Sequence, residues 1–324
     1  MVLHWGRCGR VGRCQEKRGS PSGLPLFVCY SKSPVGKTSA AHYNVVQQSA
    51  EKQVLKENMP LILITNDDGI RSPGLLAAAE AVHDLGEILV VAPKYQQTGA
   101  GRSMFAFKNV LVQEEHIAVG GQKVPAFSVE GTPAQAVLYA LLEVVPRKPS
   151  LAISGINYGE NLGTGITASG TVGAALEAAA FGIPSLAISL ETAKKYHYNV
   201  SDDIDFTAAA LFTRIFAQHL LLVKLPPDVD VLKVDVPEDA TAETPWRLTR
   251  VSRQRYLHPI KSGSTDSSGA STIDYETRVD FDALEPDSDI FALVKDRVVS
   301  VSPLTLDLSS RVDLRHLAQL LRSG

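Results

Sequence analysis

The first strong hydrophobic pattern in the chain is the apolar run at residues 61–65 (LILIT), which ends at Asn66, two adjacent carboxylates and Gly69. Apolar residues at every position, rather than at every second one, predict a strand buried on both faces, as in a parallel sheet covered by helices. The chain leaves such a sheet at the carboxyl end of the strand, where open α/β folds bind their ligands. The pattern therefore places Asp67 and Asp68 at an edge expected to bind a ligand.

Apolar strands and amphipathic helices alternate over the next 170 or so residues. We expect strands over 61–65, 87–92, 151–154, 184–190 and 231–236, and helices over 73–85, 133–145, 169–181 and 202–220. Residues 105–130 predict short strands around a Gly120-Gly121 turn. This alternation is typical of a doubly wound α/β domain, in which right-handed crossovers bring the loops after the strands to one edge.

The pattern changes beyond Pro237. Residues 246–252 and 298–301 predict further strands, whereas 255–289 are polar, rich in Ser, Gly and Asp, and poorly periodic. We expect a β-arm or a mobile loop there, used in oligomerisation or as a lid. The chain should end in a helix within 304–322 that packs on a neighbour.

The first 58 residues form a basic leader that differs from the rest of the chain. Residues 1–50 carry seven Lys or Arg against one Glu, although the net charge of all 324 residues is −3. All three cysteines also precede residue 30. The leader is interpreted as an organelle transit segment, a disordered tail or non-native sequence before a start at Met59. The domain itself, 59–324, lacks cysteine, which suits a reducing compartment such as the cytoplasm.

Composition narrows the class of protein. A hydrophobic content of 44% is enough for a sizeable core, and no apolar run reaches the length of about 18 residues that a membrane span requires. The net negative charge argues against a stable nucleic-acid partner. A soluble enzyme-sized domain is the prediction.

Two carboxylates side by side repel each other and need a counter-charge. A hard divalent cation held by the oxygens of Asp67 and Asp68 is the simplest one. The alternative is structural: the two residues cap the helix that begins near Ser72 and hold a turn with Gly69. One Asp would suffice for that, so the pair favours a metal site.

A second polar cluster follows the strand at 151–154 and runs to residue 173. Asn157 offers an amide oxygen to a divalent cation, and Asn161 can donate its amide to an anionic oxygen. Ser169-Gly170-Thr171 opens a helix, where free N–H groups attract phosphate. Each residue also has an ordinary explanation in turns and helix caps. Two such clusters at one sheet edge favour a binding site.

Residues 163–168 (GTGITA) satisfy the dinucleotide-binding pattern G-x-G-x-x-A, with Glu191 near the expected acidic position. That pattern should follow its strand at once, yet eight residues separate Ser154 from Gly163. A dinucleotide-binding oxidoreductase would also leave the paired aspartates without a role. This rival, and a non-catalytic metal- or nucleotide-binding module, are retained as alternatives.

Together these motifs resemble the SurE survival-protein family of metal-dependent 5′/3′-nucleotidases. The matching segments keep their order and spacing from residue 60 to about 190, and the first 58 residues lie outside the resemblance. The segments are 66–69 (NDDG), 72–74 (SPG), 91–93 (VAP), 98–100 (TGA), 131–133 (GTP), 154–157 (SGIN), 161–163 (NLG) and 169–172 (SGTV).

The resemblance implies a Rossmann-like core with a β-rich C-terminal extension, assembly into a homodimer or homotetramer, and one divalent cation, Mg²⁺ or Mn²⁺, per subunit. The family's metal ligands fall on four positions: Asp67, Asp68, Thr98 and Asn157. Thr98 departs from the serine usual in the family, and its methyl group is expected to crowd the site. Glu160 stands where the family often has proline, which predicts a looser loop before Asn161.

The predicted activity is hydrolysis of nucleoside 5′-monophosphates, with 3′-monophosphates as further candidate substrates. The catalytic residues are expected to be Asp67, Asp68 and Asn161, with Asp67 as ligand, base or nucleophile. The expected phosphate-binding residues are Asn161, Ser169, Gly170 and Thr171. Neither cluster contains a histidine. His258 is the only histidine considered for a functional role, although a solvated or structural role is the simpler interpretation.

Overall fold

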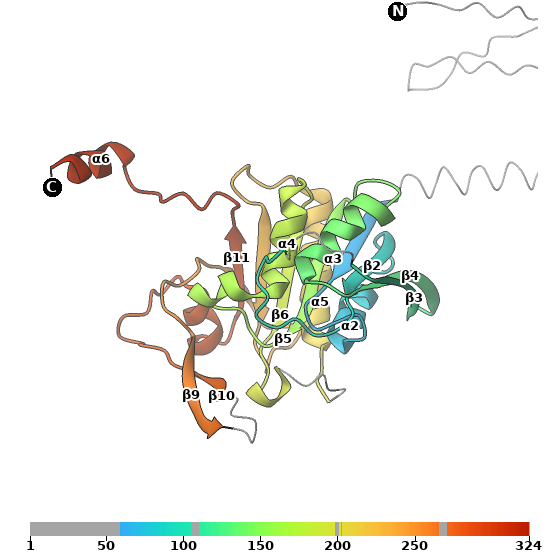
Figure 1. Cartoon of the computed structure of the whole chain (residues 1–324), viewed down its shortest axis with the longest axis horizontal. Helices are drawn as coiled ribbons and strands as arrows, with labels where there is room; N and C mark the ends of the chain where they lie inside the picture. The colour runs from blue at the N-terminus through green and yellow to red at the C-terminus, as the bar shows by residue number, and fades with distance from the viewer. Residues whose placement is uncertain (1–58, 105–109, 198–200, 202, 266–270, 324) are drawn as a thin grey trace, which may run out of the picture. The chain divides into compact units, whose positions relative to one another are not determined.

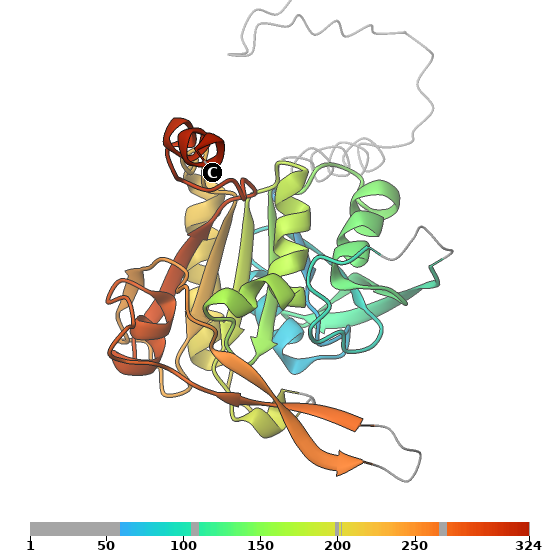
Figure 2. The ribbon, with the colours of Figure 1, turned by 60° about the vertical axis from the view of Figure 1, so that its left-hand side comes forward.

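A computed structural model describes residues 59–104, 110–197, 201, 203–265 and 271–323 of the chain (Figures 1 and 2). The interpretations of the basic leader, and of Met59 as its boundary, concern residues 1–58, which lie outside the described residues.

The described residues build a large, mostly parallel sheet with the strand order β3-β4-β2-β1-β5-β6-β7-β11-β8. All neighbours from β4 to β7 run parallel, whereas β3 and β11 run antiparallel to β4 and β7. The bounds are β1 Leu61–Thr65, β2 Glu87–Pro93, β3 Val112–Val119, β4 Gln122–Val129, β5 Leu151–Tyr158, β6 Ser185–Leu190, β7 Val231–Val236, β8 Trp246–Leu248 and β11 Val299–Leu304.

Helices cover both faces of this sheet (Figure 1). The α-helices are α2 Pro73–Val82, α3 Pro133–Tyr139, α4 Gly170–Ala180, α5 Thr207–Leu222 and α6 Leu314–Arg322, with short η elements at η1 Ala140–Val144, η2 Thr164–Ala168, η3 Lys194–Tyr196 and η4 Phe291–Lys295. Ile62 and Ile64 pack with α2 and α5, whereas Leu61 and Leu63 face the core formed by α3 and α4. The uninterrupted apolar run of β1 is thus explained, because both of its faces are buried.

The predicted α/β class is confirmed, and most predicted elements lie within a few residues of those observed. The largest difference is in β5, which continues through Tyr158 instead of ending at Ser154. Asn157 pairs with Ser189 of β6 after a register shift, so this polar residue belongs to the strand end. The polar residues after Ser154 predict a loop, but their backbones still pair with β6.

The C-terminal region extends the sheet and adds a separate hairpin. Strand β11 pairs with β7, and the antiparallel strands β9 Leu257–Thr265 and β10 Ser271–Thr277 form an arm (Figure 2). Of the two expectations for 255–289, the β-arm is therefore the observed one. Helix α6 begins at Leu314, ten residues after β11 ends.

Candidate metal and phosphate site

The site lies where the strand order of the sheet reverses. From β1 the chain proceeds to β2 on one side, whereas β5 lies on the other side of β1. Thr65 of β1 is the register partner of Ser154 of β5. The segments that follow these two strands diverge at this point, which is the usual ligand site of doubly wound folds. Asp67 follows β1, and Asn157 lies at the end of β5.

A tight turn presents the two aspartates. The side chain of Asn66 is fully buried and closes the turn, because its Oδ1 accepts from Gly69 N at 3.2 Å and its Nδ2 donates to Gly69 O at 3.1 Å. Gly69 has φ +100°, a conformation that strongly favours glycine. Asn66 therefore acts as the scaffold of the motif, while Asp67 and Asp68 project from it.

Both carboxyl groups are almost fully buried, at 4% and 5% exposure. Burial raises the pKa of Asp67 to about 6, although hydrogen bonds from Thr171 and Gly170 oppose the shift. Burial, and then the charge of Asp67, raise the pKa of Asp68 to about 8. The pair is thus poorly compensated by the protein alone, and it would favour a bound cation.

Asp68 is held from two sides. Its Oδ2 accepts from Tyr158 N at 3.2 Å, and its Oδ1 accepts from Gln96 Nε2 at 3.0 Å. The same Gln96 nitrogen donates to the carbonyl of His197 at 2.9 Å. Sequence reasoning missed Gln96 because a glutamine in a polar loop carries no distinctive signal.

Thr98 lies in the loop after β2. Backbone hydrogen bonds hold this loop in place on both sides of Thr98. Gln97 N donates to the carbonyl of Asp67 at 2.7 Å, and Gly101 N donates to the carbonyl of Ala168 at 2.9 Å. Thr98 itself is exposed between these anchors. The structure therefore brings this candidate ligand next to the aspartate turn, as the sequence predicts, with its side chain open to solvent.

The two candidate asparagines, Asn157 and Asn161, both interact with Ser189 of β6. Asn157 donates its amide N–H to Gly159 O at 2.6 Å, which leaves its amide oxygen as the group available to a cation. Asn161 Nδ2 donates to Ser189 Oγ at 2.9 Å, and Ser189 is the register partner of Asn157. Asn161 thus lies beside the end of β5 rather than in a loose loop.

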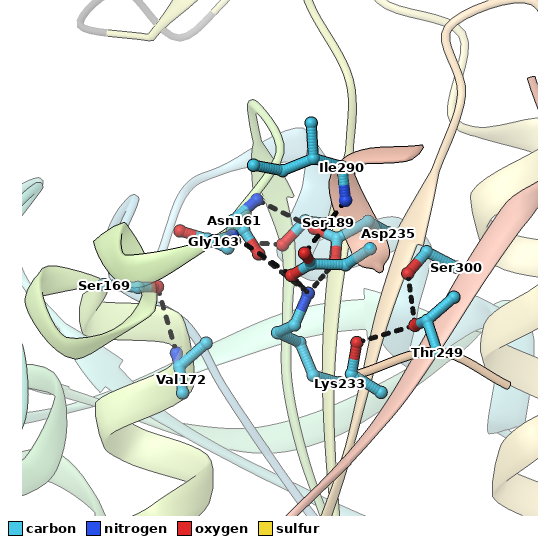
Figure 3. A network of polar contacts seen from close by, with 12 residues as sticks. Asn161, Gly163, Ser169, Val172, Ser189, Lys233, Asp235, Thr249, Ile290 and Ser300 are labelled. Atoms are coloured by element: carbon cyan, nitrogen blue, oxygen red, sulfur yellow. Dashed lines mark hydrogen bonds and ion pairs between the residues drawn. The ribbon is translucent and has the colours of Figure 1, made fainter. Parts of the chain in front are cut away.

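The start of α4 faces Asp67. Thr171 Oγ1 donates to Asp67 Oδ1 at 2.5 Å, and the backbone of Gly170 and Thr171 also hydrogen-bonds to this carboxyl group. Ser169 instead caps the helix, since its Oγ accepts from Val172 N at 3.2 Å (Figure 3). The predicted phosphate-binding segment is therefore in direct contact with the predicted metal site, with its donors directed at Asp67.

The donor set fits a hard divalent cation. Within the described residues, His, Cys, Asp and Glu side chains form no group of three that could hold a metal ion. Two carboxylates with an amide and a hydroxyl oxygen are nevertheless the oxygen ligands that Mg²⁺ and Mn²⁺ take, and Mg²⁺ usually keeps several waters. The two poorly compensated carboxyls are the observation that favours a cation here.

One histidine lies nearer to this site than the sequence suggested. His197 stacks on Tyr275 of the β-arm, and its Nδ1 lies 2.6 Å from the Tyr275 hydroxyl. Burial lowers the pKa of His197, which favours the neutral ring. His258, in contrast, is a half-buried residue of β9, and its ring Nε2 lies 2.7 Å from the carbonyl of Arg255. His197 connects the arm to Asp68 through Gln96, a link that sequence spacing could not reveal.

The segment with the dinucleotide-binding pattern does not form a dinucleotide-binding loop. Residues Thr164–Ala168 form the short helix η2, separated from β5 by a loop, rather than the start of an α-helix directly after a strand. Glu191, the expected ribose ligand, is ion-paired with Arg297 at 2.6 Å. The structure therefore does not support the oxidoreductase alternative.

Gly170 permits the close approach of α4 to Asp67. A Cβ atom at this position would lie 2.7 Å from both Cβ and Oδ2 of Asp67. We expect Gly170→Ala to displace the Asp67 carboxyl and to lower turnover about 10- to 100-fold. Steady-state kinetics test this, with Gly165→Ala as the matched control because a Cβ there meets no atom within 4 Å. Equal rates for the two variants would contradict the assigned role of Gly170.

The fold and site define an α/β protein with a candidate cation- and phosphate-binding edge at its topological switch point. The family described as "Survival protein SurE" matches residues 62–258. The 5′-nucleotidase SurE of Thermococcus gammatolerans is 41% identical over 260 residues, 80% of this chain and 95% of the relative. That of Archaeoglobus fulgidus is 40% identical over 78% of this chain and 94% of the relative.

The crystal structure of the SurE protein from Aquifex aeolicus is similar as well, with a TM-score of 0.64 and 30% identity over 81% of this chain and all of that one. The chain therefore belongs to the SurE family, as its motifs indicated.

Proposed function

We infer that this protein is a 5′-nucleotidase, a phosphomonoester hydrolase that releases phosphate from nucleoside 5′-monophosphates. Relatives that bear this name match most of the chain at about 40% identity. The observation that carries the inference on the structural side is the buried Asp67–Asp68 pair beside the start of α4. A non-catalytic binding module has no comparable support.

We propose that Asp67, Asp68, Thr98 and Asn157 hold one divalent cation per subunit, Mg²⁺ or Mn²⁺. When bound, the cation would neutralise charge on a phosphate oxygen and make water a better nucleophile. The buried carboxyls suit this role because the cation supplies the counter-charge that they lack. Asn157 would contribute its amide oxygen, since its N–H already serves Gly159.

We propose that Asn161, Ser169, Gly170 and Thr171 bind the phosphoryl group. An amide nitrogen carries two hydrogens, and the contact of Asn161 with Ser189 uses one of them. The second can donate to a phosphate oxygen, as a donor that is already oriented before the substrate arrives. At the start of α4, the N–H groups of Gly170 and Thr171, which now donate to Asp67, and the positive end of the helix dipole would favour the same anion.

Asp67 is the proposed proton acceptor or nucleophile. Its carboxyl lies against Thr171 and the α4 backbone, so the phosphate and Asp67 would share one set of donors. Asp68 is assigned as a ligand only, because its donors, Gln96 and Tyr158, lie away from the start of α4 where the phosphate is placed. The two neighbouring carboxylates are therefore assigned unequal roles.

Assembly and location are proposals as well. We propose a homodimer or homotetramer in the cytoplasm, without a stable nucleic-acid partner. Helix α6 supports self-association, because its leucines are exposed, Leu314 at 69% and Leu321 at 75%. Among the residues that the structure describes, every helix is too short or too polar to cross a bilayer. Light scattering of the purified chain would test the oligomeric state.

Phosphate release from a panel of nucleoside 5′- and 3′-monophosphates tests the function. The full chain is treated with a chelator, and Mg²⁺, Mn²⁺ or no metal is then added back. We expect no release without metal and restored release with at least one of the two cations. Release that ignores chelation would contradict the metal-dependent mechanism, and absence of release under every condition would contradict the enzyme assignment.

A further inference from the structure

A buried ionic network lies directly beneath the loop that carries Asn161 (Figure 3). Lys233 and Asp235, both on β7, and Asp289, just before η4, are completely buried. Lys233 Nζ is paired with Asp235 Oδ2 and lies 3.2 Å from Asp289 Oδ2. Charged groups are rarely buried in a core without a reason, because their desolvation is costly and apolar side chains would pack as well.

The network holds the loop by its backbone. Lys233 Nζ donates to the carbonyl of Asn161 at 2.8 Å, and Asp235 Oδ1 accepts from the backbone N–H of Asn161 at 2.7 Å. Asp289 Oδ2 accepts from Gly163 N at 3.1 Å. The donor and the acceptor of the Asn161 backbone are thus both fixed by oppositely charged, fully buried side chains.

Asp235 and Asp289 must each be a carboxylate, because both oxygens of each side chain accept from hydrogen-bond donors. Both oxygens of Asp235 are occupied by donors, one by Asn161 N and the other by Lys233. Asp289 is used in the same way: its Oδ1 accepts from the N–H groups of Ser252 and Ile290, and its Oδ2 accepts from Gly163 N. An amide in either place would direct an NH₂ group at a donor, so Asn is not an equivalent residue here.

We propose that Lys233, Asp235 and Asp289 are positioning residues that hold Asn161 in its phosphate-binding orientation, with Ser189 fixing its side chain. This inference rests on the proposed role of Asn161 in the nucleotidase reaction. The network touches the Asn161–Gly163 backbone, whereas no contact with the side chains of Asp67, Asp68, Thr98 or Asn157 is found for these three residues in the described part of the chain. Substitutions in the network should therefore impair the interaction of Asn161 with the phosphate and leave the affinity for the cation unchanged.

The network also connects the C-terminal region to the loop that carries Asn161. Asp289 lies 126 positions after Gly163 and anchors Ser252 at the same time. A region outside the strands that carry the predicted ligands thereby fixes a loop of the site. Asp235→Asn is the informative change, because it leaves Lys233 and Asp289 as a balanced pair of opposite charges, which favours retention of the fold.

The test is a double-mutant cycle on the full chain with Mg²⁺ and a nucleoside 5′-monophosphate. Asp235→Asn and Ser189→Ala are each made in the wild-type and the Asn161→Ala backgrounds. Ser185→Ala is the matched control: Ser185 is a buried serine at the start of β6, whose hydroxyl donates at the same distance, 2.9 Å, to the carbonyl of Ile183, and its partner on β7 is Val231. Calorimetric titration with Mn²⁺ supplies a second readout that is independent of turnover.

We expect Asp235→Asn to lower kcat about 10-fold and Ser189→Ala about threefold, with Mn²⁺ affinity within about twofold of wild type. In the Asn161→Ala background, neither change should lower kcat more than about twofold further. Full additivity, or an equal loss in Ser185→Ala, would overturn the inference. A wild-type rate in Asn161→Ala would overturn the role of Asn161 itself, and wild-type protein without phosphatase activity would refute the proposed function.

Discussion

Replacing Asp67 by Asn is expected to lower kcat/KM for nucleoside monophosphates by about 10³-fold or more, with the fold retained. The change removes a negative charge from the proposed cation site and also removes the proposed proton acceptor or nucleophile. It also directs an NH₂ group towards the hydroxyl of Thr171 or the backbone of α4, which now donate to the carboxylate. All three effects act on turnover.

The fold should tolerate the change because the Asp67 carboxyl does not stabilise the metal-free protein as a charged group. Its pKa is raised to about 6 by burial, so its ionised form is the disfavoured one. Steady-state kinetics and thermal unfolding measure the two properties separately. Asp84→Asn is the matched control, because this carboxylate pairs with Arg214 at the surface. A near-normal rate for Asp67→Asn would place the reaction elsewhere.

The proposed cation ligands Asp67, Asp68 and Asn157 could be predicted from the sequence because their signals are local. The apolar run of β1 and the aspartates that follow it are contiguous, so burial of the strand and the position of its end are visible together. Asn157 was predictable for the same reason, although its place inside β5 was not. The role of Thr171 was only partly visible, since its hydroxyl donates to Asp67, 104 positions earlier.

The supporting network could not be predicted, for a physical reason. Lys233 and Asp235 occur in the segment VLKVDV, where two charges interrupt an otherwise apolar strand, and this pattern resembles a strand with one solvated face. Their burial depends on Asp289 and on the Asn161 loop, which come from distant parts of the chain. The same holds for Gln96 and His197, which are brought to Asp68 only by tertiary packing.

The stability of the metal-free protein is expected to fall as the pH rises from about 4 to about 8. Folded-state pKa values of about 6 for Asp67 and about 8 for Asp68 lie above the ordinary value of 3.8, so the folded state binds more protons than the unfolded state throughout this range. The free energy of unfolding therefore decreases with pH. Between pH 6 and pH 8, retention of the Asp68 proton alone corresponds to a loss of about 2 kcal/mol.

A divalent cation should reverse this trend, because it binds the ionised carboxylates and competes with their protons. We expect Mg²⁺ to raise the free energy of unfolding more at pH 8 than at pH 6, as binding to the folded state alone requires. Asp68→Asn should give the opposite result: higher stability than wild type at pH 8 in chelator, with little stabilisation by Mg²⁺. Urea unfolding at both pH values, with chelator or Mg²⁺, measures all of these quantities. Equal stability of the metal-free wild type at pH 6 and pH 8 would show that the Asp67–Asp68 pair is already compensated by the protein, which removes the physical reason for placing a cation there.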